Sequence, residues 1–241
     1  MSDTVLADQR GVYDRMRVAC PMAESPRGVT LFRHGDVVAA AANPSTFSSA
    51  TSPRRMVPNS LDEPEHTAFR RAIDTFFTPE RMDELEPRFR EIARGIVCSL
   101  PRDATVDAVT EIGYPLAVCA QADWLGWQGI EDDLLAWMAE NHAATRSRDR
   151  SRTIAVAAAF DEIVLAQVRR RRQMGDAAPK DPTTELLATM VNGELLTDTD
   201  IVSILRNWTA GDLASMAAAV GVVVYFLATH PEVQEELREH P

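Results

Sequence analysis

The sequence predicts a mainly α-helical fold with a minor β-sheet. Most of the chain consists of stretches in which apolar residues recur every three or four positions, which is the period of an amphipathic helix. Residues 29–33, Val-Thr-Leu-Phe-Arg, have the β-branched and aromatic composition of a strand and follow Pro26 and Gly28. The chain has no repeat of fixed period and no low-complexity linker, so one helix-rich unit is the simplest interpretation.

The remaining elements follow the predicted strand in order. A helical pattern over residues 35–42 ends at Asn43-Pro44. Residues 45–59 contain Ser, Thr and proline and predict a long loop, and loops of this length are often functional. Further helices are predicted over residues 64–77, 79–100, 109–127, 131–146, 151–174 and 183–191.

The longest helical pattern covers residues 197–228. Thr197 with Asp200 three residues later resembles a capping box, and Pro231 prevents continuation of the helix. Residues 213–228 are almost wholly apolar but rich in Ala and Gly, and they are too few to span a bilayer. We therefore expect a central buried helix rather than a membrane helix.

The charge balance argues against several kinds of partner. The formal net charge of -11 at pH 7 repels nucleic acid and anionic membranes. Residues 1–17 mix acidic, basic and apolar side chains, which is typical of neither a signal sequence nor a membrane anchor. We expect a cytoplasmic protein with no nucleic-acid partner and no membrane partner.

The cysteines predict neither a disulfide framework nor a metal site. Cys20, Cys98 and Cys119 are odd in number and widely spaced, with no Cys-x-x-Cys pair. Cys98 and Cys119 lie in apolar stretches, so we expect them to be buried and inert. The basic run 169–172, near the end of a helix, is predicted to be a solvated face.

A pair of basic residues could form a carboxylate-binding site. Pro64 begins a predicted helix, which places His66 and Arg70 at positions i and i+4 on one face. Arginine offers a bidentate fork to a carboxylate. The alternative is a solvated surface pair, which is the better interpretation for an isolated His and Arg.

The long helix has a second notable feature, a face with little side-chain bulk. Ala210, Ala214, Ala217, Ala218 and Gly221 recur at spacings of three and four residues. A flat group could lie against such a face. From periodicity alone, tight packing against another helix is the favoured interpretation.

Several segments together resemble the cytochrome P-450 family in order and spacing. Residues 29–38 and 43–49 are similar to the family's first strand, its B helix and the start of the substrate-covering B–C loop. Residues 61–71, Leu-Asp-Glu-Pro-Glu-His-Thr-Ala-Phe-Arg-Arg, resemble its C helix. Residues 208–215, Trp-Thr-Ala-Gly-Asp-Leu-Ala-Ser, fall where the I helix crosses the distal haem face, and residues 229–234 look like the start of helix J.

The resemblance implies a haem-thiolate monooxygenase that inserts one oxygen atom of O₂ into a small organic substrate. Its cofactor would be haem b, with electrons from a flavin and iron–sulfur redox partner or a fused reductase. His66 and Arg70 would contact the haem propionates, and Ala210, Gly211 and Ala214 would line the distal face.

The sequence departs from the family pattern in the I helix. The family usually has an acid followed by threonine where this chain has Leu213 and Ala214. That pair delivers protons, which leucine and alanine cannot do. Asp212, Ser215 or Thr209 could organise a substitute water chain, so these three residues are the candidate catalytic groups.

The resemblance also implies a fold that is incomplete at the C-terminus. Residues 1–241 would be the amino-terminal part of a single haem domain, with strand 1 and helices A to J. The Glu-x-x-Arg helix and the Phe-x-x-Gly-x-x-x-Cys-x-Gly haem loop are absent from the sequence. We therefore expect no axial ligand to the metal and no catalytic activity from these residues alone.

Two non-enzymatic alternatives remain. The chain could be a helical binding or scaffold protein that keeps the front half of the fold without haem, and haem uptake would separate the two interpretations. A helical ligand-binding repressor is the other alternative, but the chain is strongly acidic and has no basic recognition helix.

Overall fold

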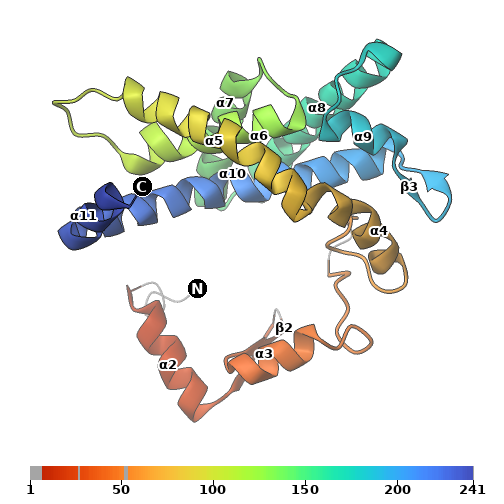
Figure 1. The fold of residues 1–241 in the computed structure, drawn as a ribbon. Helices are drawn as coiled ribbons and strands as arrows, with labels where there is room; N and C mark the ends of the chain where they lie inside the picture. The colour runs from red at the N-terminus through yellow and green to blue at the C-terminus, as the bar shows by residue number, and fades with distance from the viewer. Residues whose placement is uncertain (1–6, 27, 52–53, 241) are drawn as a thin grey trace.

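One long helix organises the structure. The computed structural model describes residues 7–26, 28–51 and 54–240, and most of them are α-helical. Helix α10 (Asp198–Thr229) runs through the middle of the helical body (Figure 1), where it packs against α6 (Tyr114–Leu125) and α8 (Arg150–Met174). Helix α5 (Pro79–Ser99) packs against α6. The predicted mainly α-helical fold with a minor β-sheet is confirmed.

The other elements fall into an N-terminal group and a set that completes the body. The first group comprises α2 (Gln9–Ala19), β1 (Met22–Ser25), β2 (Gly28–Leu31) and α3 (His34–Ala41). The second comprises α4 (Glu65–Asp74), η1 (Thr75–Phe77), η2 (Ala108–Gly113), α7 (Glu131–Ser147), η3 (Gly175–Ala177), α9 (Pro182–Ala188), β3 (Met190–Val191), β4 (Glu194–Leu195) and α11 (Pro231–Glu239).

Two antiparallel hairpins form the described sheets. Strand β2 coincides with most of the predicted strand and pairs with β1, which was not predicted. Strands β3 and β4 are joined by Asn192-Gly193, both at positive φ, which is the usual composition of a two-residue hairpin turn. The prediction that a helix continues to Val191 is therefore wrong. The Asn-Gly dipeptide was the signal that indicated a hairpin instead.

Helix α10 begins and ends where its sequence predicts. The side chain of Thr197 accepts a hydrogen bond from the backbone N–H of Asp200 at 3.1 Å, and Pro231 begins the next helix. Its buried side chains all lie at or before Ala217. The prediction of a buried helix is right for the first half and wrong for the second, where Val222 and Tyr225 are 67% and 73% exposed.

Helix α10 also meets the length and hydropathy criteria for a membrane span. Meeting these criteria is weak evidence for a membrane helix, because the core helix of a soluble protein can meet them as well.

The helix predicted over residues 109–127 is divided in two. Its first turn and a half form the π-helix η2, and a regular helix, α6, begins at Tyr114. Here Gly113 lies directly against α10, because a Cβ atom at this position would stand 2.6 Å from the carbonyl oxygen of Ala217. Likewise, a Cβ at Gly221 would stand 2.5 Å from Val109. At Gly113 two backbones approach this closely, which requires glycine, whereas the neighbour of Gly221 is a valine side chain.

A buried ion pair joins three helix ends in the body. Arg171 is 2% exposed; its guanidinium lies 2.9 Å from the carboxylate of Asp181 and also donates to the carbonyl of Gly126. The prediction that residues 169–172 form a solvated face is therefore wrong for Arg171. The turn after α8 brings Asp181 back onto the last turn of that helix, and a single helical pattern gives no sign of this return.

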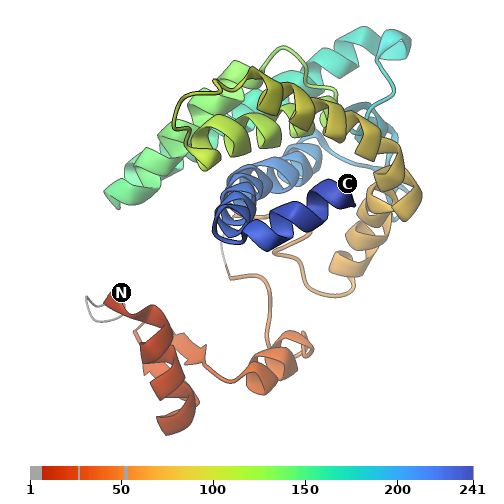
Figure 2. The ribbon, with the colours of Figure 1, turned by 60° about the vertical axis from the view of Figure 1, so that its left-hand side comes forward.

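The N-terminal group lies apart from the helical body (Figure 2). Residues 7–26 and 28–50 include no buried side chain. Their printed aromatic contact, Tyr13 with Phe32 at 5.8 Å between ring centroids, stays within the group. The core of the described chain therefore begins at Val57.

Candidate functional site

Helix α4 presents the predicted basic pair on its exposed side. Phe69 and Ile73 are buried and fix the orientation of the helix. The His66 and Arg70 side chains are 39% and 45% exposed, one helical turn apart on the same face. An exposed pair of this kind can take up an anionic ligand.

Both basic side chains have acidic neighbours on or next to their own helix. His66 Nδ1 lies 3.6 Å from a carboxylate oxygen of Glu63, and the Arg70 guanidinium lies 2.5 Å from Asp74. Exposed pairs of this type stabilise by only about 0–1 kcal/mol. A carboxylate ligand could therefore replace Asp74 at Arg70 at little cost.

The predicted loop between α3 and α4 is held against α10 at Val57. Val57 is fully buried; its N–H donates to Ser203 Oγ at 2.8 Å, and its carbonyl accepts from Asn207 Nδ2 at 2.7 Å. The loop therefore reaches α10 one turn before Ala210. Residues 52 and 53, which the loop prediction included, lie outside the described residues.

Asp62 ties the start of this loop to the start of α4. Its carboxylate accepts from Ser48 Oγ and from the Ser49 N–H, the second at 2.8 Å. These hydrogen bonds hold the pKa of the Asp62 carboxyl below its usual range. Asp62 and α10 thus both anchor the loop.

The face of small residues on α10 divides into two stripes. Ala217 and Gly221 pack against η2, which confirms the tight-packing interpretation for these two positions. Gly211 and Ala218 are exposed and Ala214 is half-buried, and a Cβ at Gly211 would meet no neighbour within 4 Å among the described residues. This second stripe is an open, flat strip along the helix.

The three candidate proton-transfer residues differ in exposure. Thr209 is fully buried, and its hydroxyl donates to the carbonyl of Leu205 at 2.7 Å. Asp212 and Ser215 are exposed. The Ser215 hydroxyl donates to the carbonyls of Gly211 and Asp212, each at 3.1 Å.

Asp212 has a carboxyl group with a raised pKa. Partial desolvation raises the pKa of its carboxyl group above the usual range, and no described residue forms an ion pair or a side-chain hydrogen bond with it. A carboxyl group with a raised pKa keeps its proton at a higher pH, as a proton donor must.

Aromatic packing fixes the middle of α10. The Trp208 ring lies 5.2 Å from both Phe76 and Phe77 and 5.3 Å from Trp124, measured between ring centroids. Gln121 Nε2 donates to the Trp208 carbonyl at 3.0 Å. These contacts orient the helix so that its buried stripe faces the body and its small-residue strip remains open.

The residues present fit one side of a planar, carboxylate-bearing cofactor. The strip of Gly211, Ala214 and Ala218 has no bulk to obstruct a flat ring, and Ala210 beside it is half-buried. The basic pair on α4 suits propionate groups. The described chain therefore offers an open, flat strip and a pair of basic side chains, which suit a planar cofactor that carries carboxylates.

None of the cysteines lies on the two helices that carry these features. Cys20 caps α2, Cys98 belongs to α5 and Cys119 to α6. The prediction that Cys98 is buried is wrong: it is exposed, because nothing in the described chain covers the end of α5. Among the described residues no group of three or more His, Cys, Asp or Glu side chains could hold a metal ion.

The fold defines a class of mainly α-helical proteins built around one long central helix. The Cytochrome P-450 family model matches residues 134–240. Together with the relatives and solved structures below, this match supports a bacterial member of the cytochrome P-450 family.

The curated relatives are longer than this chain. Nocardicin C N-oxygenase of Nocardia uniformis subsp. tsuyamanensis is 29% identical over 98% of the chain, which covers 61% of that protein. Vitamin D(3) 25-hydroxylase of Pseudonocardia autotrophica is 28% identical over 75% of the chain and 44% of its own length. The chain thus spans roughly half of these two relatives.

Solved structures agree with the observed fold over nearly the whole chain. The LnmA cytochrome P-450 hydroxylase of Streptomyces atroolivaceus S-140 has a TM-score of 0.78 at 25% identity, with 96% of this chain and 62% of that chain covered. The bottromycin biosynthetic protein SalCYP has a TM-score of 0.82 at 24% identity, with coverages of 96% and 61%. The predicted family fold is confirmed.

The contacts that attach the loop to α10 were not predicted. Ser203 and Asn207 read as ordinary positions of a helical pattern, and Val57 as part of a proline-rich loop. Val57 is separated from each of these two partners by about 150 residues in the chain. A single sequence has no local signal for such contacts.

Proposed function

We propose that this chain supplies the distal half of a haem-thiolate monooxygenase that inserts one oxygen atom of O₂ into a small organic substrate. The observation that carries the proposal is the open strip Gly211–Ala214–Ala218 on a helix that packs against η2, α6 and α8. Haem b would be the cofactor, and a flavin and iron–sulfur redox partner or a fused reductase would supply electrons. The acidic charge and the bacterial relatives support a cytoplasmic location.

His66 and Arg70 would hold the haem propionates, with Arg70 exchanging Asp74 for a propionate oxygen. When bound, the haem would supply an iron centre at which dioxygen is activated, with a thiolate ligand favouring O–O cleavage. Ala210, Gly211 and Ala214 would keep the space above the ring free of side chains. The chain's role is thus to orient the cofactor and shape its distal space.

Proton delivery is assigned to α10. Asp212, with its raised pKa, would hold a proton at its carboxyl oxygen, and Ser215 on the same exposed side would orient water. Thr209 would act only if its hydroxyl leaves the Leu205 carbonyl. Asp212→Asn and Ser215→Ala are therefore expected to lower the coupling of electron use to product, measured in a complete haem-loaded protein, more than Thr209→Ser does.

The thiolate ligand is proposed to come from none of the three cysteines of this chain. Burial raises the pKa of the half-buried Cys119 thiol, which opposes thiolate formation. We therefore expect residues 1–241 to bind haem without the red-shifted carbon monoxide band of a thiolate complex, and to be inactive by themselves. Appearance of that band in the isolated chain would contradict this assignment.

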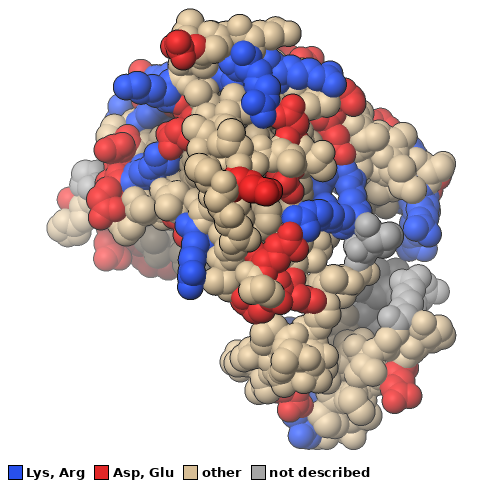
Figure 3. All heavy atoms as spheres, turned by 90° about the vertical axis from the view of Figure 1, so that its right-hand side faces the viewer, with Lys and Arg blue, Asp and Glu red and all other residues tan. Residues whose placement is uncertain are grey.

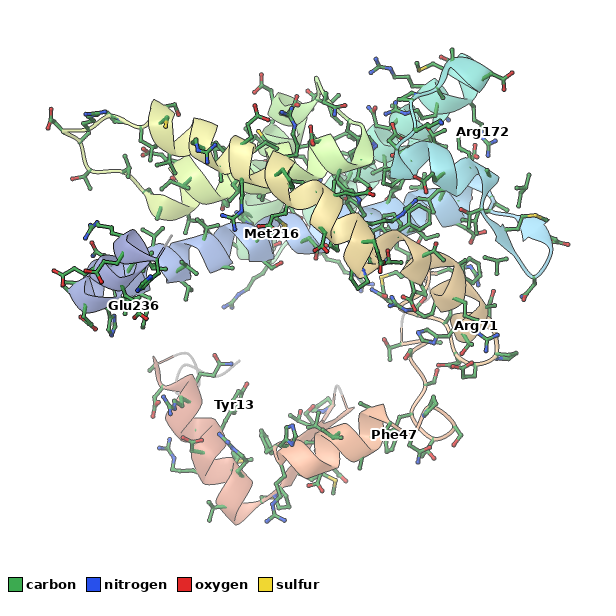
Figure 4. All side chains as sticks on the ribbon, in the orientation of Figure 1. Tyr13, Phe47, Arg71, Arg172, Met216 and Glu236 are labelled. Carbon is green, nitrogen blue, oxygen red and sulfur yellow. The ribbon has the colours of Figure 1, made fainter. Side chains whose placement is uncertain are left out.

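A haem titration tests the proposal directly. The chain is titrated with haem while the absorption of the bound cofactor is followed, and Arg70→Gln is compared with Arg71→Gln, a neighbour on the exposed surface of α4 (Figure 4). Loss of one charge-assisted hydrogen bond predicts about tenfold weaker binding for Arg70→Gln and no change for Arg71→Gln. If the chain takes up no haem, the scaffold interpretation replaces the enzyme.

A further inference from the structure

A cavity of about 510 Å³ lies beside the first half of α10, between that helix, α8 and the loop before α4. Leu165 and Val202 supply apolar lining. Arg54, Arg169 and Arg206 contribute three guanidinium groups from three different segments. None of the residues assigned above to the haem or to proton delivery lines this cavity.

The charges of the cavity do not cancel. Four arginines and three carboxylates line it, so the formal charge of the lining is 4 − 3 = +1. Two of these groups are neutralised from outside, because Arg55 pairs with Glu65 at 2.7 Å and Asp198 pairs with Arg172. The other charged groups of the lining are Arg54, Arg169, Arg206, Asp161 and Glu162.

Asp161 stands between two of the arginines. Its Oδ1 lies 2.9 Å from Arg206 Nη1, and its Oδ2 pairs with the guanidinium of Arg54. One carboxylate therefore serves two guanidinium groups, while Arg169, two turns further along the same face of α8, has no ion pair with any described residue. The Arg206 side chain is only 13% exposed, so solvent screens its charge incompletely.

The excess charge is local. On the face shown in Figure 3, basic and acidic side chains are interspersed over the helical body and form no continuous basic surface. A polyanion such as nucleic acid would meet carboxylates as well as basic side chains there. A small monoanion that enters the cavity meets the excess directly.

We propose that this cavity binds the carboxylate of a small organic acid, with Arg206 and Arg169 as its principal ligands and with Leu165 and Val202 against its apolar body. Arg206 lies one helical turn, about 6 Å, before Ala210 on the same side of α10. A carboxylate held there would direct the rest of the molecule toward the distal strip. That the bound acid is the substrate of the enzyme rests on the function proposed above.

The test compares phenylacetate with its neutral analogue phenylacetamide by titration calorimetry on the 241-residue chain, without haem. Phenylacetate is expected to bind at least tenfold more tightly. Arg169→Gln is expected to remove about tenfold of its affinity, whereas Arg170→Gln, one position along α8 and outside the cavity lining, leaves it unchanged.

Two charge variants separate ligand binding from a merely structural role of the ion pairs. Asp161→Asn releases Arg206 and should tighten phenylacetate binding severalfold, although it breaks both ion pairs. Glu162→Gln leaves those pairs intact and should also tighten it. Equal binding of the acid and the amide, or weaker binding in both variants, would overturn the proposal.

The test is independent of the proposed function because no haem takes part. If the acid is preferred but the chain takes up no haem, the anion site stands and the monooxygenase fails. If haem binds and the acid is not preferred, the reverse holds.

Discussion

The N-terminal group, residues 7–50, and the helical body, residues 54–240, contain the same kinds of elements but differ in how these elements are stabilised. The body buries a continuous core around α10, whereas the described residues of the N-terminal group bury nothing. In the N-terminal group Val18 is 84% exposed and Phe47 is 54% exposed. Amphipathic patterning thus specifies helices in both regions, but a core only where elements meet.

The largest expected effect tests the body at its buried ion pair. Arg171→Ala leaves the Asp181 carboxylate buried without its partner, which should cost about 3–5 kcal/mol in the free energy of unfolding. Urea denaturation followed by circular dichroism measures it. Arg170→Ala is the control, because Arg170 is exposed; a similar loss in both variants would refute the role given to the pair.

The close approach of η2 to α10 allows a glycine of the body to be compared with a glycine of the N-terminal group. Gly113→Ala places a methyl group against the Ala217 backbone and should destabilise the protein by about 1–3 kcal/mol. Gly35→Ala in α3 meets no neighbour within 4 Å and should not destabilise. Thermal unfolding of the two variants measures both effects, and destabilisation by Gly35→Ala would show that the N-terminal group is packed after all.

Asp62 links the two regions and predicts a pH dependence. Because its folded-state pKa is lowered, its stabilising contribution is present above the ordinary carboxyl pKa and is lost as pH falls through the folded value. Protection of the Ser49 amide from hydrogen exchange should therefore decrease below about pH 4. Asp62→Asn should weaken that protection at pH 6 also. Unchanged exchange in this variant would mean that the link contributes nothing.

The smallest expected effect is that of removing the N-terminal group. Deletion of residues 1–47 removes no buried side chain of the described chain, so the free energy of unfolding of the body should change by less than about 1 kcal/mol. A larger loss in urea denaturation would show that the two regions fold together.

The elements with strong local signals were predicted well. The Thr197 cap, Pro231 and the helical period placed α10 within a residue at each end. The i, i+4 spacing of His66 and Arg70 correctly placed both side chains on one face of α4. Their role toward haem remains a prediction. The hairpin at Asn192-Gly193 was missed although its signal was present.

The division of the small-residue face could not be predicted. Ala217 and Gly221 pack against η2, whereas Ala214 and Ala218 stay open, yet all four carry the same signal in the sequence. Periodicity gives the faces of a helix but not the element that covers each face. The burial of Arg171 and the partners of Val57 depend in the same way on distant segments.

The sequence alone determined the helical class, the position and length of α10, the basic pair on α4 and the resemblance to the cytochrome P-450 family. These depend on side chains a few residues apart, where spacing and capping act directly on the backbone. The tertiary structure decided which stripe of α10 is open, where the loop attaches and which arginines surround the cavity. Those features depend on contacts between segments up to 150 residues apart, which only the packed chain brings together.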